Sequence, residues 1–88
     1  PSADGIAALV GYLLRAGCIP AIEHTERPGP RQVYWEMWKL PLFEARSTDE
    51  VLGEIEACAT AHPRSYVRLI GYDPRRQGQV LSVVVRRP

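Results

Sequence analysis

An aromatic stretch that ends at a proline constrains the fold of this chain more than any other feature. Residues 33–40 are rich in aromatic and branched side chains, which favours a β-strand, and Pro41 ends it. Because side chains alternate along a strand, Trp35 and Trp38 point to opposite faces of the sheet. One predicted face carries Tyr34, Glu36 and Trp38, and the opposite face carries Trp35, Met37 and Lys39. Large side chains on both faces favour a partner that covers one of them, and the alternative is a well-packed monomer with a few exposed aromatics.

Two other segments have the periodicity of amphipathic helices. Ser2 or Asp4 can cap the first helix, and Gly17 ends it. Its apolar face, with spacings of three and four residues, is Ile6, Leu9, Val10, Leu13 and Leu14. The second helix opens at Ser47, which fits a capping box with Glu50, and a proline ends it. Its predicted apolar face is Val51, Leu52, Ile55, Cys58 and Ala59.

Three further strands are predicted, at residues 18–25, 66–73 and 79–86. Residues 26–31 contain two prolines and a glycine and therefore form a loop, and a short turn joins the last two strands. The order α-β-β-α-β-β predicts an α+β fold, a four-stranded antiparallel sheet with two helices packed on one face. The length predicts a single domain over residues 1–88.

Composition argues against several classes of function. The net charge of +1 argues against DNA or an anionic membrane as the main partner. The apolar stretches are far shorter than the roughly 20 residues of a membrane span, and no signal peptide is visible. Two cysteines are too few for a disulfide scaffold and favour a reducing compartment. Residues 63–88 contain six arginines and one aspartate, which indicates either a polar interface or a solvated surface.

Patterns for catalysis and metal binding are weak. His24 and His62 have no acid partner placed by a known motif. Cys58 lies on a predicted apolar helix face, where a buried and inert thiol is expected. Cys58 and His62 share a helix face, and Cys18 shares a strand face with His24. This spacing fits no zinc module. We therefore expect no catalytic residue, metal or cofactor on this chain.

The aromatic stretch and the residues after it are specific enough to indicate a family. They read Tyr34-Trp35-Glu36-Met37-Trp38-Lys39-Leu40-Pro41-Leu42-Phe43. This run resembles the signature of the small subunit of form I ribulose-1,5-bisphosphate carboxylase/oxygenase (Rubisco), of the bacterial type with a short loop between the first two strands. Four further segments match the family in order: residues 17–23, 47–58, 66–73 and 76–77. The resemblance covers residues 1–88.

The resemblance implies a structural subunit without catalytic residues. In this family, eight small subunits cap an octamer of large subunits, which hold the active sites, the magnesium ion and a carbamylated lysine. The small subunits stabilise that assembly and modulate CO2 fixation, with neither nucleic acid nor a membrane as a partner. The expected location is the bacterial cytoplasm or a carboxysome within it. The residues implied to contact large subunits are Tyr34, Trp35, Trp38, Leu40, Pro41, Leu42, Phe43, Glu23, Arg68 and Asp73.

The sequence departs from the family at two places. The family has an N-terminal arm before the position of Pro1, which is missing here, and Cys18 stands where an aromatic residue is usual. The sequence is also compatible with two other functions. One is a small-subunit-like adaptor domain of a carboxysome scaffold, although such domains generally lack the intact aromatic run. The other is a stand-alone RNA-binding α/β domain, which the C-terminal arginines favour but the order of elements does not.

Overall fold

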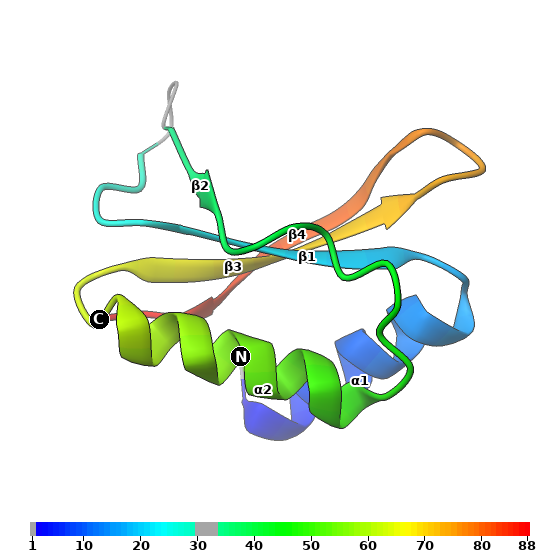
Figure 1. The fold of residues 1–88 in the computed structure, drawn as a ribbon, viewed down its shortest axis with the longest axis horizontal. Helices are drawn as coiled ribbons and strands as arrows, with labels where there is room; N and C mark the ends of the chain where they lie inside the picture. Colours follow the sequence, from blue (N-terminus) through cyan, green and yellow to red (C-terminus); the bar gives the residue numbers. More distant parts are fainter. Residues whose placement is uncertain (1, 30–33) are drawn as a thin grey trace.

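Two helices lie on one face of a four-stranded antiparallel sheet (Figure 1). The computed structural model describes residues 2–29 and 34–88. The elements are α1 (Ala3–Arg15), β1 (Ile19–Thr25), β2 (Glu36–Met37), α2 (Thr48–Ala61), β3 (Tyr66–Asp73) and β4 (Gly78–Arg86). The strand order is β2-β1-β3-β4, so that β1 and β3 form the centre of the sheet. The α+β fold and the order of elements predicted from the sequence are confirmed.

Both helices begin at serines that satisfy free N–H groups of the first turn. The Ser2 hydroxyl accepts a hydrogen bond from the Gly5 N–H at 3.0 Å, so the first of the two predicted caps of α1 is the one used. The Ser47 hydroxyl accepts a hydrogen bond from the Glu50 N–H at 3.2 Å. The Glu50 carboxylate accepts one from the Arg46 N–H at 2.9 Å, which places the return bond of the capping box one residue before Ser47.

The core fills the space between the helices and the inner face of the sheet. Its fully buried side chains include Ile6, Val10, Leu13, Ile22, Val51, Ile55, Cys58, Val67 and Leu69. Gly71 lies on the same inner face, and a Cβ atom there would lie only 2.5 Å from Leu13 Cδ2. Leu13 can therefore pack closely against β3 because position 71 has no side chain.

The strand predicted at residues 33–40 is wrong in its extent. Only Glu36–Met37 pair with β1 as a strand, and residue 33 lies outside the described residues. Lys39 has a φ of 60°, a left-handed conformation that interrupts an extended strand. Pro41 follows and has no N–H to donate to a ladder. The aromatic content of the stretch indicated a strand, but the backbone beyond Met37 cannot continue one.

The chain nevertheless stays beside β1 after β2 ends. The Trp38 N–H donates to the Ile22 carbonyl at 2.7 Å, and the Leu42 N–H donates to the carbonyl of residue 20 at 2.8 Å. Trp38 packs toward the helices, whereas Trp35 lies against Arg68 on the outer face, so the prediction of opposite faces for the two tryptophans is confirmed. Lys39 was predicted on the face of Trp35 but reaches α2 instead, because its positive φ redirects the side chain.

Candidate partner interface

The outer face of the sheet, opposite the helices, carries a compact charged group. Glu23 and Arg68 are paired across β1 and β3, and Arg68 Nη2 lies 2.6 Å from Glu23 Oε1. The Arg68 guanidinium lies 4.2 Å from the centre of the Trp35 ring, within cation–π range. Glu23, Arg68 and Trp35, which the resemblance implied one by one as partner contacts, therefore lie together on this face. Since the two charges cancel and the side chains hold each other in place, this group presents an ordered and nearly neutral polar surface.

An apolar hollow lies next to this group on the same outer face. It has a volume of about 240 Å³ and lies between the outer faces of β1 and β3 and residues 41–43. Its apolar lining is Ile19, Ala21, Met37, Pro41, Phe43, Ile70 and Tyr72. The predicted residues Pro41 and Phe43 are part of this hollow. The sequence did not single out Ile70 and Tyr72 as candidate contacts, although side-chain alternation along β3 puts them on one face with Arg68.

Residues 34–43, which we call the docking segment, expose large apolar side chains to solvent. Tyr34 is 78% exposed, Leu40 74% and Phe43 65%. Side chains so exposed contribute little to the core of this chain, and exposed apolar side chains of this size are the kind that partners cover. Leu42 differs from them, because it is only partly exposed and packs against the core.

Trp38 anchors the docking segment from the inside. Its indole N–H donates to Glu54 Oε1 of α2 at 2.9 Å, and its ring packs against the core. Lys39 Nζ donates to Glu54 Oε2 at 3.2 Å. The hydrogen bond from Trp38 and then that from Lys39 lower the pKa of the Glu54 carboxyl below its ordinary value of 4.5. This anchor is therefore fully present above that value and weakens as the pH falls through the lowered pKa. Trp38 therefore supports the docking segment from its inner side, and its contact with a partner stays a prediction.

Trp38→Ala is expected to lower the free energy of unfolding of the free chain by about 2 kcal/mol, because partial burial of the indole and one hydrogen bond are lost. Urea unfolding followed by circular dichroism measures this difference. Trp38→Phe is the matched control, since it retains an aromatic ring against the core and should cost only about 1 kcal/mol. A Trp38→Ala chain as stable as the unsubstituted one would show that the indole does not support the fold.

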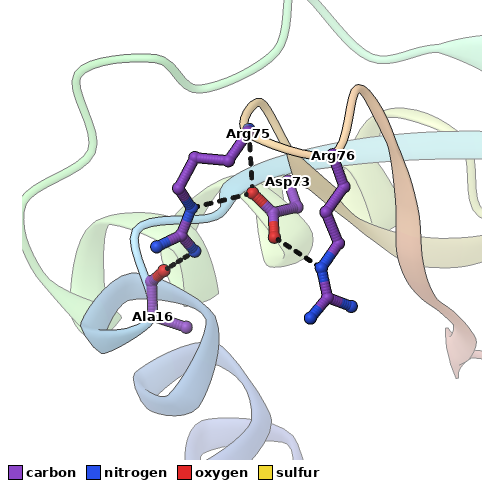
Figure 2. A network of polar contacts seen from close by, with 4 residues as sticks. All are labelled: Ala16, Asp73, Arg75 and Arg76. Carbon is purple, nitrogen blue, oxygen red and sulfur yellow. Dashed lines mark hydrogen bonds and ion pairs between the residues drawn. The ribbon is translucent and has the colours of Figure 1, made fainter.

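Asp73 holds the hairpin of β3 and β4 to the end of α1 (Figure 2). Its Oδ1 accepts hydrogen bonds from the Arg75 N–H at 3.0 Å and from Arg75 Nε at 3.1 Å, and Arg76 Nε lies 3.7 Å from Oδ2. Arg75 Nη2 donates in turn to the Ala16 carbonyl at 2.6 Å. These arginine contacts, that from the Arg75 side chain first, lower the pKa of the Asp73 carboxyl. The side chain is buried, so that a partner would meet Arg75 and Arg76 before it met Asp73.

The histidines and cysteines are not arranged as a metal site. His24 and His62 stack on each other, with ring centres 3.9 Å apart. Burial raises the pKa of the Cys58 thiol to about 11, so it is protonated and unreactive at neutral pH. Within residues 2–29 and 34–88, no group of three or more His, Cys, Asp or Glu side chains could hold a metal ion. Among the helices in the described ranges, none has the length and hydropathy needed to cross a membrane.

Comparison with known proteins identifies the family. Residues 2–88 match the family described as "Ribulose bisphosphate carboxylase, small chain". The chain belongs to the family of Rubisco small subunits. The Rubisco small subunit of Prochlorothrix hollandica is 47% identical over 83 residues, which cover 94% of this chain and 76% of that protein. The Rubisco small subunit of Xanthobacter flavus is 43% identical over 89 residues, which cover 99% of this chain and 67% of that protein.

A solved structure agrees with the membership of this chain in the Rubisco small-subunit family. A chain of Rubisco from Galdieria partita superposes with a TM-score of 0.92 at 32% sequence identity. The match covers 100% of the present chain and 65% of the Galdieria chain, so the present chain spans just under two thirds of it. Small subunits of this family are parts of a carboxy-lyase and are not themselves catalytic. Neither the scaffold-adaptor function nor the RNA-binding function is favoured by these relatives.

Several features of the interface could not be found in the sequence. The sequence named Glu23, Arg68 and Trp35, but their mutual contact depends on the register between β1 and β3. The contact of Trp38 with Glu54 joins residues 16 positions apart, and no local pattern indicates it. The capping box marks the start of α2 and the residue pattern of 66–73 indicates β3, but neither signal shows which side chains of these elements meet.

Proposed function

We propose that the chain docks on Rubisco large subunits through the docking segment and the outer face of the sheet. The observation that carries this proposal is the exposure of Tyr34, Leu40 and Phe43 on a segment that is fixed from the inside. Among the described residues, both helices lie on the inner face of the sheet, so neither helix covers its outer face (Figure 1). A partner that fills the apolar hollow and covers the exposed residues would gain about 25 cal/mol per Å² of apolar surface removed from water.

The polar groups at this surface fix orientation more than they add affinity. Glu23 and Arg68 already neutralise each other, so burying the pair leaves no unpaired charge. The stacked Trp35 holds the Arg68 guanidinium in one plane, which favours a partner with acceptors placed to match its free N–H groups. The register of the complex is therefore set by a small, rigid polar group beside a larger apolar contact.

The proposed assembly contains eight large and eight small chains, in which the small chains cap the large-subunit octamer. The active sites, the magnesium ion and the carbamylated lysine belong to the large subunits in this proposal. The effect of the small chain on CO2 fixation is then indirect. Its buried docking segment holds neighbouring large subunits together and restrains elements behind their active sites. The assembly would reside in the bacterial cytoplasm or in a carboxysome.

Co-expression with a bacterial form I large subunit, followed by native mass spectrometry, tests this proposal. The expected result is one complex whose mass corresponds to eight large and eight small chains. Carboxylation measured on that complex should exceed the activity of the same large subunits without the small chain. The proposal would be contradicted if the large-subunit octamer and the small chain were found unbound to each other. The same result would have to be obtained with a second, more closely matched large subunit.

A further inference from the structure

Two histidines stack beneath the docking segment and link it to the rest of the fold. His24 of β1 is buried, and its ring lies 3.9 Å from that of His62, with 16° between the planes. His62 caps the C-terminal end of α2. Its ring also meets the Trp38 ring in a nearly perpendicular arrangement, with centres 5.9 Å apart. Rings from β1, α2 and the docking segment therefore form one continuous aromatic contact.

The surroundings of this stack disfavour a positive charge on His24. Burial, and next the nearness of His62, lower the pKa of His24, whereas Glu36 on the paired strand acts in the opposite direction. Behind Trp38, Glu54 and Lys39 form an ion pair that adds no net charge. The other ionisable groups that line the open side of the stack are Glu26, Arg27 and Tyr34.

We propose that the stack of His24 and His62 is a proton-sensitive latch that releases the docking segment when both rings are charged. Two like charges on stacked rings repel each other, so His62 moves away and Trp38 loses the ring that supports it. The hydrogen bonds from the Trp38 N–H to Ile22 and from the Leu42 N–H to residue 20 then open. Since the pKa of His24 is lowered in the folded chain, the stack stabilises the segment above the ordinary histidine pKa of about 6.5 and is lost as the pH falls further.

Amide hydrogen exchange of the free 88-residue chain, measured by NMR, tests the latch. After correction for the intrinsic pH dependence of exchange, protection of the Trp38 and Leu42 amides should fall roughly tenfold between about pH 7.5 and about pH 5. Amides of the central strand β3 should keep their protection over this range. In His62→Phe, which keeps a flat ring against His24 but cannot be charged, the fall should be much smaller. The measurement needs no large subunit, so its outcome is separate from that of the docking proposal.

Three results of the exchange experiment would overturn the latch. They are unchanged protection at low pH, an equal fall in His62→Phe, and an equal loss throughout β3, which would indicate general acid unfolding. Because His62→Phe can itself disturb the stack, the imidazole NMR signals of the unsubstituted chain give a second test. The pair should take up its protons in two separate steps, the second below the ordinary histidine range. A single step at the ordinary value would contradict the proposal.

Discussion

The Leu40→Asp/Phe43→Asp double variant is expected to keep the fold of the chain and to lose its binding to Rubisco large subunits. Leu40 is 74% exposed and Phe43 65% exposed, so the free chain loses little when they are replaced. At the centre of an interface, by contrast, an apolar anchor is typically worth about 2 kcal/mol or more. Two such losses, made worse by burial of charges without partners, should weaken binding roughly a thousandfold.

A matched variant on the helical layer separates a docking effect from a general surface effect. Tyr12 of α1 is 56% exposed but lies on the layer opposite the outer sheet face, so Tyr12→Asp should assemble normally. Binding is measured by native mass spectrometry over a series of concentrations, and folding by circular dichroism. The free energies of unfolding of the double variant, of Tyr12→Asp and of the unsubstituted chain should lie within about 0.5 kcal/mol of one another. If the double variant assembled normally, or if Tyr12→Asp did not assemble with large subunits, the interface would lie elsewhere on the chain.

Gly71→Val is expected to lower the free energy of unfolding by about 2 to 3 kcal/mol, because it overpacks the core between α1 and β3. The new Cβ would lie 2.5 Å from Leu13 Cδ2 and 3.2 Å from its Cδ1. Leu13 is fully buried between α1 and the sheet, so its side chain has no free space into which it can withdraw. A domain of this size has a total stability of roughly 5 to 10 kcal/mol, so a substantial fraction would be lost.

Gly53→Ala is the control for this substitution. Gly53 is an exposed residue of α2, and no atom lies within 4 Å of the position of its missing Cβ. Alanine there should raise the free energy of unfolding by about 0.5 to 1 kcal/mol, because it reduces the conformational freedom of the unfolded chain. Urea unfolding curves of both variants measure the two changes. Equal stability of Gly71→Val and the unsubstituted chain would show that α1 does not depend on the close approach at residue 71.

The fold could be predicted from the sequence because its determinants are local. The spacing of Ile6, Val10 and Leu13 indicates one face of a helix, and Ser47 marks the start of another. β3 has the bounds that its alternation predicted, and β1 and β4 differ from their predicted bounds by one residue each. Two helices and four strands in this order can bury their apolar faces in few ways, so the order of elements was enough to predict the architecture.

The features that could not be predicted depend on contacts between distant segments. The left-handed Lys39 is stabilised by its contact with α2, and nothing in the aromatic stretch indicates a break there. The resemblance suggested Asp73 as a partner contact, which stays a prediction, but no local pattern indicated the hydrogen bond that its carboxylate accepts from Arg75. The two stacked histidines are 38 positions apart in the sequence, so only the packing of α2 on β1 brings them together.

Hydroxyl-radical footprinting of the chain, alone and in its complex with large subunits, tests most directly whether the docking segment and the outer face of the sheet contact the large subunits. Met37, Phe43 and Tyr34 are exposed in the free chain and should react readily there. In the complex, all three should be strongly protected, while Tyr12 on the helical layer should react as before. Protection of Tyr12 together with unchanged reactivity of Met37 and Phe43 would show that the helices, and not the outer face of the sheet, contact the large subunits.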